Sequence, residues 1–412
     1  MRIKIGAPER MRGRIILPSS KSISNRALTI NALAGGLIEP ENVSDCDDTR
    51  VMREWLSSRP KTIDIGAAGT AMRFSTALLA VSEGEHIITG TERMKNRPIS
   101  VLVEALRQLG AEVEYVEKEG YPPLRIKGNM NLEGGEVSLP GNVSSQYISA
   151  LLMIAPKLKK GLRLTLTGNI VSRPYIDMTL SVMRAYGACA AWEGECIVVK
   201  PVPYVSCPYK VESDWSAASY WYEMVALAED VDAEVVLPGL FADSLQGDSH
   251  GAELFEQLGV HTEHRGDEVV LTKQGKCVEF LQHDFVEMPD LAQTFVVTCC
   301  MMGIPFHFTG LQSLKIKETD RILALKTELA KLGFCIEDRN DSELLWNLQK
   351  CSADGAKCGI DTYEDHRMAM AFAPAAWKMG NIIINDPQVV SKSYPRYWED
   401  LTSVGFEVTP IE

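Results

Sequence analysis

The chain of 412 residues lacks long apolar runs and any excess of basic charge. No run reaches the ~18 apolar residues of a membrane-spanning helix, and the N-terminal segment Met1–Gly6 lacks the apolar core of a signal peptide. The net charge of -13 disfavours nucleic acid as a partner, because proteins that bind the phosphate backbone need a basic face. We therefore expect a cytoplasmic protein with no membrane and no nucleic-acid partner, in which a local basic pocket binds any anionic ligand.

The sequence also lacks the cysteine and histidine patterns of metal sites. Its ten cysteines form no Cys-x-x-Cys motif, and Cys299 and Cys300 lie in an apolar run. The close histidine pair, His261 and His264, has no further ligand residues beside it. Because structural zinc sites need four ligands at short spacings, we expect buried, reduced thiols and no metal.

What the sequence does contain is a repeated pattern, in which an amphipathic helix is followed by a glycine and a short alternating strand. The glycines at the helix ends are 77, 72, 74 and 72 residues apart, at Gly110, Gly187, Gly259, Gly333 and Gly405. Such regular spacing indicates duplicated subdomains, and the chain is too long for a single core. A sixth, truncated copy begins at Asp47 and stops at Ser58 without its glycine.

The spacing of apolar residues in two of these helices predicts which face is buried. They recur at i, i+3, i+7 and i+10 in two sets, which are Ile99, Leu102, Leu106, Leu109 and Ile322, Leu325, Leu329, Leu332. This period places each set on one side of a helix. Gly110 and Gly333 should then close their helices in the left-handed conformation.

Charged residues or prolines precede the helices of the repeat. The expected starts are Arg97-Pro98, Arg173-Pro174-Tyr175, Gly247-Asp248, Lys317-Glu318-Thr319-Asp320-Arg321 and Lys392-Ser393-Tyr394-Pro395. Because a helix N-terminus carries partial positive charge, starts that face a common space would bind polyanions. Val211–Trp215, which follows three prolines, is the best candidate for a crossing between two halves, and a second crossing is expected near Arg14–Pro18. We therefore expect one domain of residues 1–15 and 213–412 and another of residues 16–212.

Three further segments place hydroxyls, glycines or an amide before an expected helix. Residues 18–26 precede a helix expected over 27–34, residues 66–73 precede one over 74–80, and Ser144-Ser145-Gln146 precede one from 147. Free backbone N–H groups and the helix dipole favour an anion there. Each segment alone is also explained by helix capping or tight packing. A Walker-type phosphate loop is excluded, since Gly-Lys-Ser/Thr does not occur.

Acidic residues beside cations could transfer protons. Asp290 follows Met288-Pro289 and precedes an apolar helix expected over 295–302. A carboxylate at a helix start keeps its charge and can act as a base. The charged run 317–321 and the pair His366-Arg367 behind Asp365 precede two more helices. A solvated turn is the alternative for the charged run.

Together these segments resemble the 5-enolpyruvylshikimate-3-phosphate synthase family, the 3-phosphoshikimate 1-carboxyvinyltransferases. The resemblance runs from about residue 4 to 392 and rests on the motifs Pro18-Ser19-Ser20-Lys21-Ser22-Ile23-Ser24-Asn25-Arg26, Gly69-Thr70-Ala71-Met72-Arg73, Arg97-Pro98-Ile99, Ser144-Ser145-Gln146, Ser172-Arg173-Pro174-Tyr175-Ile176-Asp177, Lys317-Glu318-Thr319-Asp320-Arg321 and Asp365-His366-Arg367-Met368-Ala369-Met370. It implies an α/β fold of two inverse α/β domains, each of three βαβαββ-type repeats, that close on an interdomain cleft, which is the enolpyruvyl transferase fold. It also implies a transferase of the shikimate pathway and aromatic amino-acid biosynthesis that needs no metal or organic cofactor. We expect a monomer.

The resemblance further implies that the enolpyruvyl group of phosphoenolpyruvate moves to the 5-hydroxyl of shikimate 3-phosphate, with release of phosphate by addition and elimination. The residues implied to contact shikimate 3-phosphate are Lys21, Ser22, Arg26, Ser144, Ser145, Gln146, Ser172, Tyr175, Asp290 and Lys317. Those implied to contact phosphoenolpyruvate are Lys21, Gly69, Arg97, Gln146, Glu318, Arg321, Arg367 and Lys392. Asp290 is the candidate base for the hydroxyl, Glu318 the candidate proton donor to C3, and Lys21 would assist the leaving phosphate.

The charge of the two substrates explains why so many cations are needed. Each phosphomonoester carries close to two negative charges and each substrate adds a carboxylate. One like-charge pair at ~6 Å and an effective dielectric of ~20 costs roughly 3 kcal/mol. The domain with the chain termini would then hold the phosphoenolpyruvate and acid–base residues, and the inserted domain the shikimate 3-phosphate residues.

Some positions depart from the family pattern, and two alternatives stay open. Ala67, Ser313 and Glu364 stand where Asn is usual or frequent, Phe74 stands where Pro is common, and the first subdomain is trimmed. One alternative is the related UDP-N-acetylglucosamine enolpyruvyl transferase, which commonly has a loop cysteine that residues 97–120 lack. The other is a non-catalytic anion-binding paralogue.

Overall fold

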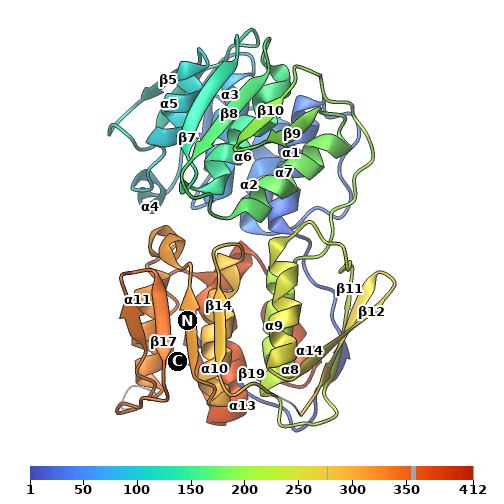
Figure 1. Ribbon diagram of the computed structural model, residues 1–412, viewed down its shortest axis with the longest axis vertical. Coiled ribbons are helices and arrows are strands. Elements are labelled where there is room, and N and C mark those ends of the chain that lie inside the picture. Colours follow the sequence, from blue (N-terminus) through green and yellow to red (C-terminus); the bar gives the residue numbers. More distant parts are fainter. Residues whose placement is uncertain (276, 354–358, 412) are drawn as a thin grey trace. The chain divides into compact units, whose positions relative to one another are not determined.

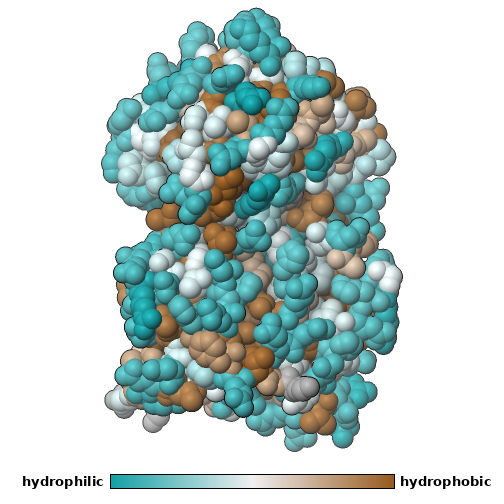
Figure 2. Space-filling view, viewed as in Figure 1, coloured by the Kyte–Doolittle hydropathy of each residue, from teal (hydrophilic) through white to brown (hydrophobic). Residues whose placement is uncertain are grey.

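The chain forms two compact units, and many of their elements are labelled in Figure 1. The computed structural model describes residues 1–275, 277–353 and 359–411. Unit 1 is Met1–Pro18 with Ser213–Glu412, and unit 2 is Ser19–Glu212. Each unit has a hydrophobic core of its own, and hydrophilic residues cover most of the face of each unit seen in Figure 2.

Unit 2 contains two four-stranded sheets of the same topology, with the orders β3-β4-β6-β5 and β7-β8-β10-β9. The strands are β3 (Thr62–Asp64), β4 (Glu85–Thr89), β5 (Glu112–Tyr115), β6 (Leu124–Lys127), β7 (Gly135–Pro140), β8 (Leu162–Thr167), β9 (Ala190–Glu193) and β10 (Cys196–Val199). The first two strands of each sheet are parallel, and the other pairs are antiparallel. Parallel neighbours need a crossover, usually a helix, which is α3 (Gly69–Ala80) in one sheet and α6 (Ser145–Ile154) in the other. A second helix follows each pair, α5 (Ser100–Gln108) or α7 (Arg173–Ala185).

The N-terminal part of unit 2 is a shortened copy of this arrangement. Helices α1 (Lys21–Leu33) and α2 (Asp47–Ser58) precede β3, and an isolated bridge pairs Glu41 with Lys210. Helix α2 covers the truncated repeat predicted from the sequence and ends with Arg59 at φ 43° instead of a glycine. The short helix α4 (Glu92–Lys95) lies between β4 and α5.

Unit 1 repeats the same pattern and uses the N-terminal strands to complete two sheets. Its sheets have the orders β12-β13-β11-β2, β14-β15-β17-β16 and β18-β1-β19. The strands are β1 (Arg2–Gly6), β2 (Arg12–Arg14), β11 (Glu234–Pro238), β12 (Val260–Arg265), β13 (Glu268–Lys273), β14 (Leu281–Asp284), β15 (Phe306–Thr309), β16 (Glu337–Arg339), β17 (Glu343–Trp346), β18 (Asn381–Asn385) and β19 (Glu407–Ile411). The helices are α8 (Trp215–Leu227), α9 (Gly251–Gln257), α10 (Ala292–Met302), α11 (Arg321–Lys331), α12 (His366–Phe372), α13 (Ala376–Met379) and α14 (Tyr397–Ser403).

The helix–glycine–strand pattern is confirmed. The five glycines have φ values of 96°, 86°, 82°, 91° and 100° at Gly110, Gly187, Gly259, Gly333 and Gly405. After α5, the amide of Ala111 donates to the Leu106 carbonyl and that of Gly110 to the Arg107 carbonyl, both at 3.0 Å, which is a Schellman-type end. Both predicted apolar faces are buried, with exposed fractions between 0% and 6%.

The predicted helix starts were wrong at several positions. Helices α1, α3 and α10 begin earlier than the expected 27, 74 and 295, and α5, α9 and α14 begin later, at Ser100, Gly251 and Tyr397. Asp290 is therefore not an N-cap but lies in the 3₁₀ turn Pro289–Leu291. In α1 the Ser20 hydroxyl accepts from the Ile23 amide at 3.4 Å, so the helix includes the polar stretch after it. Asn25 and Arg26 in that stretch are buried, which apolar periodicity could not indicate.

The prediction of buried thiols holds for only some of the cysteines. Among the described residues, Cys46, Cys299 and Cys300 are buried, whereas Cys189, Cys277 and Cys351 are exposed, and all are free thiols. Cys358 lies outside the described residues. The described part of the chain contains no helix long and apolar enough to cross a bilayer. It also contains no group of three or more His, Cys, Asp or Glu side chains arranged to hold a metal ion.

Candidate active site

Asp290 lies at the centre of a charged cluster in unit 1. Its Oδ1 accepts from Lys317 Nζ at 3.3 Å and from Arg321 Nη1 at 3.0 Å, and its Oδ2 accepts from Arg367 Nη2 at 2.9 Å. These cations come from the starts of α11 and α12 and from the loop before α11, so three segments converge on one carboxylate. Opposite charges at such distances favour the charged form of a carboxyl group. The structure therefore brings together residues that the sequence placed far apart.

Arg321 links Asp290 to two more carboxylates. Its Nε donates to Asp365 Oδ2 at 2.7 Å and its Nη2 to Glu318 Oε2 at 2.8 Å. The side chain is 2% exposed. Burial alone would lower the pKa of Arg321, but the carboxylates of Asp365, Glu318 and Asp290 outweigh it and raise the pKa. The guanidinium is thus a fixed cation that holds Glu318, 23% exposed, beside Asp290.

Arg367 is held from the other side by two residues of α8. Its Nη1 donates to the Tyr220 hydroxyl at 3.4 Å, and its Nη2 to the Ser216 hydroxyl at 3.5 Å. Ser216 in turn donates to the buried carboxyl group of Asp248. Burial, followed by the nearby charge of Asp290, raises the pKa of Asp248 to about 7.

Lys392 is tied to the loop that precedes α12. Its Nζ donates to the Glu364 carbonyl at 2.7 Å. Tyr363 and Glu364 both have positive φ, at 53° and 56°, a conformation that costs energy in residues other than glycine. The Tyr363 hydroxyl donates to the buried Glu328 of α11 at 2.6 Å, which anchors this loop.

In unit 2, the predicted substrate residues other than Arg97 lie in the first two turns of α1, α3, α6 and α7 or directly before them, and these helices pack against one another. Gln146 Nε2 at the start of α6 donates to the Thr70 hydroxyl in α3 at 3.2 Å. Ser144 caps α6, with its hydroxyl 3.4 Å from the Gln146 amide. The other residues at these starts are Lys21, Ser22, Gly69, Ser145, Ser172 and Tyr175.

Arg26 is a structural link among these helices as well as a predicted substrate contact. It donates to the Thr179 hydroxyl at 2.7 Å, the Ser22 carbonyl at 2.8 Å, the Tyr175 carbonyl at 3.1 Å and the Ser149 hydroxyl at 3.2 Å. These bonds use four of the five N–H donors of a guanidinium. Burial lowers the pKa of Arg26 to about 10. One Nη1 hydrogen is thus the donor left for a ligand.

Gly69 lies against two guanidinium groups. A methyl group at this position would be 2.5 Å from Arg97 Nη1 and 2.7 Å from Arg73 Nη1. Arg73 donates to the Gly69 carbonyl at 2.8 Å and lies over the Tyr147 ring at 5.4 Å. The Tyr147 hydroxyl donates to the Pro98 carbonyl at 2.5 Å, which fixes the segment after Arg97. Two adjacent cations beside a glycine form a place where an anion can approach closely.

The sequence of the whole chain matches that of a known enzyme family. The pattern described as EPSP synthase (3-phosphoshikimate 1-carboxyvinyltransferase) matches residues 5–60 and 53–401. A 3-phosphoshikimate 1-carboxyvinyltransferase of Bacteroides fragilis is 59% identical over 409 residues, which cover 99% of this chain and 99% of that protein. The chain belongs to the EPSP synthase family.

Other EPSP synthases agree with this result. A 3-phosphoshikimate 1-carboxyvinyltransferase of Vibrio cholerae is 36% identical over 96% of this chain and 98% of its own length. The solved structure of EPSP synthase from Acinetobacter baumannii has a TM-score of 0.78 at 22% identity, with both chains covered in full, and shows the same fold. The predicted family, fold class, enzyme class and enolpyruvyl transfer in the shikimate pathway are confirmed. The UDP-N-acetylglucosamine and non-catalytic alternatives are not favoured.

Sequence reasoning missed three residues that adjoin the charged cluster of unit 1. Ser216 and Tyr220 of α8 contact Arg367, and no local signal marks them, because the contact depends on the packing of α8 against α12. Asp248 stood at an expected helix start but was not assigned to the site. Its position after a glycine in a 3₁₀ turn gave no indication that its carboxyl group is buried.

Proposed function

We propose that the Asp290 cluster carries out the acid–base steps of enolpyruvyl transfer from phosphoenolpyruvate to the 5-hydroxyl of shikimate 3-phosphate. The observation that supports this most is the convergence of Lys317, Arg321 and Arg367 on the Asp290 carboxylate, with Glu318 held beside it by Arg321. Cations in such numbers suit two substrates that bear phosphate and carboxylate groups.

In the first step, the 5-hydroxyl oxygen bonds to C2 of phosphoenolpyruvate while Asp290 takes the hydroxyl proton. Glu318 gives a proton to C3, so the methylene becomes a methyl group and a tetrahedral ketal forms. In the second step, C3 returns a proton to Glu318 and the bond from C2 to the phosphate oxygen breaks. The departing phosphate takes up one proton, and Asp290 gives up the hydroxyl proton that it accepted, so both carboxyl groups return to their starting states. Lys21 assists by neutralising the charge on the departing phosphate.

Each unit supplies a distinct set of contacts in this proposal. For shikimate 3-phosphate these are Lys21, Ser22, Arg26, Ser144, Ser145, Gln146, Ser172 and Tyr175 of unit 2, and Asp290 and Lys317 of unit 1. For phosphoenolpyruvate these are Lys21, Gly69, Arg97 and Gln146 of unit 2, and Glu318, Arg321, Arg367 and Lys392 of unit 1. The backbone amides at the helix starts of unit 2 suit phosphate oxygens, because helix dipoles favour anions there.

The departures from the family pattern weaken individual polar contacts and leave the charged groups in place. Ala67 removes an amide side chain close to Gly69, so affinity for phosphoenolpyruvate is expected to fall modestly. Arg73, adjacent to Arg97 against Gly69, adds a cation to the same place. The cytoplasmic location and the monomeric state stay predictions.

The direct test is phosphate release by the wild-type chain. With phosphoenolpyruvate and shikimate 3-phosphate, we expect steady release of one phosphate per enolpyruvyl ether formed. Shikimate without its phosphate, and UDP-N-acetylglucosamine, are the matched acceptors and should give less than about 1% of that rate. Release that does not depend on shikimate 3-phosphate, or that is fastest with UDP-N-acetylglucosamine, would contradict the proposal.

A further inference from the structure

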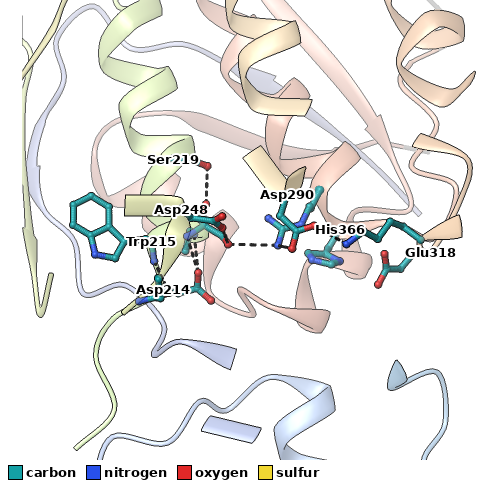
Figure 3. A network of polar contacts seen from close by, with 12 residues as sticks. Asp214, Trp215, Ser219, Asp248, Asp290, Glu318 and His366 are labelled. Atoms are coloured by element: carbon teal, nitrogen blue, oxygen red, sulfur yellow. Dashed lines mark hydrogen bonds and ion pairs between the residues drawn. The ribbon is translucent and has the colours of Figure 1, made fainter. Parts of the chain in front are cut away.

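The buried carboxyl group of Asp248 lies behind the charged cluster of unit 1. Asp248 belongs to the 3₁₀ turn Gly247–His250 and is 4% exposed. This turn packs against the start of α8, where Asp214 caps the helix by accepting from the Ser216 amide at 2.8 Å. Figure 3 shows Asp214 and Asp248 close together, with Asp290 and Glu318 to one side.

A continuous chain of hydrogen bonds joins Asp248 to Asp290. The Ser216 hydroxyl donates to Asp248 Oδ2 and accepts from Arg367 Nη2 at 3.5 Å. The same Nη2 donates to Asp290 Oδ2 at 2.9 Å. Ser216 has one hydroxyl hydrogen, so giving it to Asp248 turns its lone pairs toward Arg367. The rotamer of Ser216, and with it one contact of Arg367, therefore depends on Asp248.

The surroundings of the other oxygen of Asp248 bear on its protonation state. Among the described residues, none offers a hydrogen-bond partner to the buried Oδ1. A buried carboxylate with one unpaired oxygen is costly, whereas a neutral acid with its proton on that oxygen costs much less. The geometry thus favours a neutral acid that accepts from Ser216 through Oδ2 and carries its proton on Oδ1.

We propose that Asp248 is a positioning residue for the phosphoenolpyruvate contact Arg367, acting through Ser216 and as a neutral acid. This inference rests on the proposed function, because it assigns Arg367 to phosphoenolpyruvate. Asp248 touches no reacting atom in this account. Its role is to fix one side of the Arg367 guanidinium while Asp290 fixes the other.

The charges around Asp248 set the pH at which this arrangement changes. Burial is the main cause that raises its pKa to about 7, the negative charges of Asp290 and Asp214 add to it, and Arg367 and the Ser216 hydroxyl oppose it. Below that pH the group is neutral, and above it a new negative charge appears behind Arg367. That charge repels an anionic substrate, so affinity for phosphoenolpyruvate should fall as the pH rises through 7.

Five variants test the proposal: Asp248→Ala, Asp248→Asn, Ser216→Ala, the double variant of Asp248→Ala with Ser216→Ala, and Ser249→Ala. Asp248→Ala removes the acceptor for Ser216, so KM for phosphoenolpyruvate should rise at least about fivefold while KM for shikimate 3-phosphate stays within twofold. Ser216→Ala should give the same split. KM for phosphoenolpyruvate in the double variant should be no higher than in Ser216→Ala alone, because the effects of substitutions along one chain of hydrogen bonds are not additive.

Asp248→Asn mimics the neutral acid and separates positioning from folding. At pH 6 its KM for phosphoenolpyruvate should match the wild-type value within twofold. Between pH 6 and 8 the wild-type KM for phosphoenolpyruvate should rise by a factor about three or more larger than the factor for Asp248→Asn. The substrate phosphate, whose second pKa is about 6, titrates in the same way with both proteins. The ratio of the wild-type KM to the KM of Asp248→Asn therefore reports the titration of Asp248 alone.

The control is Ser249→Ala, one residue further along the same turn, whose hydroxyl donates to the Gln246 carbonyl at 2.8 Å. It should leave both KM values unchanged. The proposal would be overturned by additive effects of Asp248→Ala and Ser216→Ala on KM for phosphoenolpyruvate, or by equal rises in the KM values of both substrates. A wild-type pH profile in Asp248→Asn would also overturn it. Phosphate release by the wild-type chain tests the proposed function independently of these variants. A failure of the proposed function can therefore be distinguished from a failure of the role assigned to Asp248.

Discussion

Two buried guanidinium groups show how charge is accommodated at the level of single residues. Arg321 is surrounded by carboxylates, which raise its pKa despite burial. Arg26 is held by hydroxyl and carbonyl oxygens, and burial lowers its pKa to about 10. Arg321 is thus paired with charged groups, whereas the oxygens that accept hydrogen bonds from Arg26 belong to uncharged groups. Both groups stay protonated at neutral pH.

The proposed acid–base pair gives the first prediction at this scale. Asp290→Ala and Glu318→Ala should each lower kcat by roughly 10²–10⁴-fold, the usual contribution of a positioned proton-transfer group. Both variants should still bind shikimate 3-phosphate, because the contacts of unit 2 are unchanged. Stopped-flow phosphate release and equilibrium binding check this. Near-normal turnover in either variant would remove that residue from its role.

Gly69 gives the second prediction at the level of single residues. Gly69→Ala places a methyl group 2.5 Å from Arg97 Nη1, so the guanidinium must move. Overpacking of this kind costs about 1–3 kcal/mol, and KM for phosphoenolpyruvate should rise roughly 5- to 150-fold. The matched control is Gly275→Ala, where an added methyl group has nothing within 4 Å. Equal KM values in the two variants would contradict the placement of Arg97.

The sequence supplied candidate residues for the site but not the contacts among them. Asp290 and the run with Lys317, Glu318 and Arg321 were separate candidates, because charges in short runs before helices are visible in the sequence. Their convergence on Asp290 required the packing of α10, α11 and α12, which join residues up to 77 positions apart. Ser216 and Asp248 could not be found in this way, since each looks like an ordinary helix-start residue.

At the level of elements, the helix ends were predictable and the helix starts were not. A glycine such as Gly333 with φ 91° has a local physical cause, because only glycine adopts that backbone easily. The starts of α1 and α3 depend on tertiary burial instead. All residues of α3 are buried, so it has no amphipathic period to indicate where it begins.

Helix α8 contains a buried acid that gives a prediction on stability. Glu223 is fully buried, and burial raises its pKa well above the usual value. In the folded protein Glu223 keeps a proton that it loses in the unfolded chain above about pH 4. The contribution of Glu223 to the free energy of unfolding therefore falls as the pH rises. Glu223→Gln should therefore raise Tm relative to wild type by a few degrees more at pH 8 than at pH 5.

Thermal unfolding followed by circular dichroism checks this at both pH values. Glu229→Gln, at an exposed position just beyond α8, is the control and should show no such pH dependence. A Tm difference between wild type and Glu223→Gln that is the same at pH 5 and pH 8 would mean that Glu223 is ionised in the folded protein.

At the level of the whole molecule, each unit has the features of an independent folding unit. The chain leaves unit 1 after Pro18 and returns at Ser213. The ends of unit 2 are adjacent, because the Ser20 amide donates to the Glu212 carbonyl at 2.8 Å. A closed segment with its own core needs no other part of the chain to complete its sheets.

Residues 19–212 expressed alone should therefore fold, with a cooperative thermal transition and protected amides in β7 and β8. A shorter fragment that ends at Pro201 is the matched control. It loses Tyr204, whose hydroxyl donates to the Met153 carbonyl at 2.8 Å, and the buried Val211, so its Tm should be lower. A non-cooperative transition in the longer fragment would show that unit 2 depends on unit 1.

The central claim is that the Asp290 cluster catalyses addition followed by elimination, with Glu318 exchanging a proton at C3. The most direct measurement is the reaction in D₂O, stopped at partial conversion and analysed by NMR. Protonation at C3 creates a methyl group that then loses one of three hydrogens, so the account predicts deuterium in the enolpyruvyl methylene of the product. Product formed without deuterium at that carbon would contradict it.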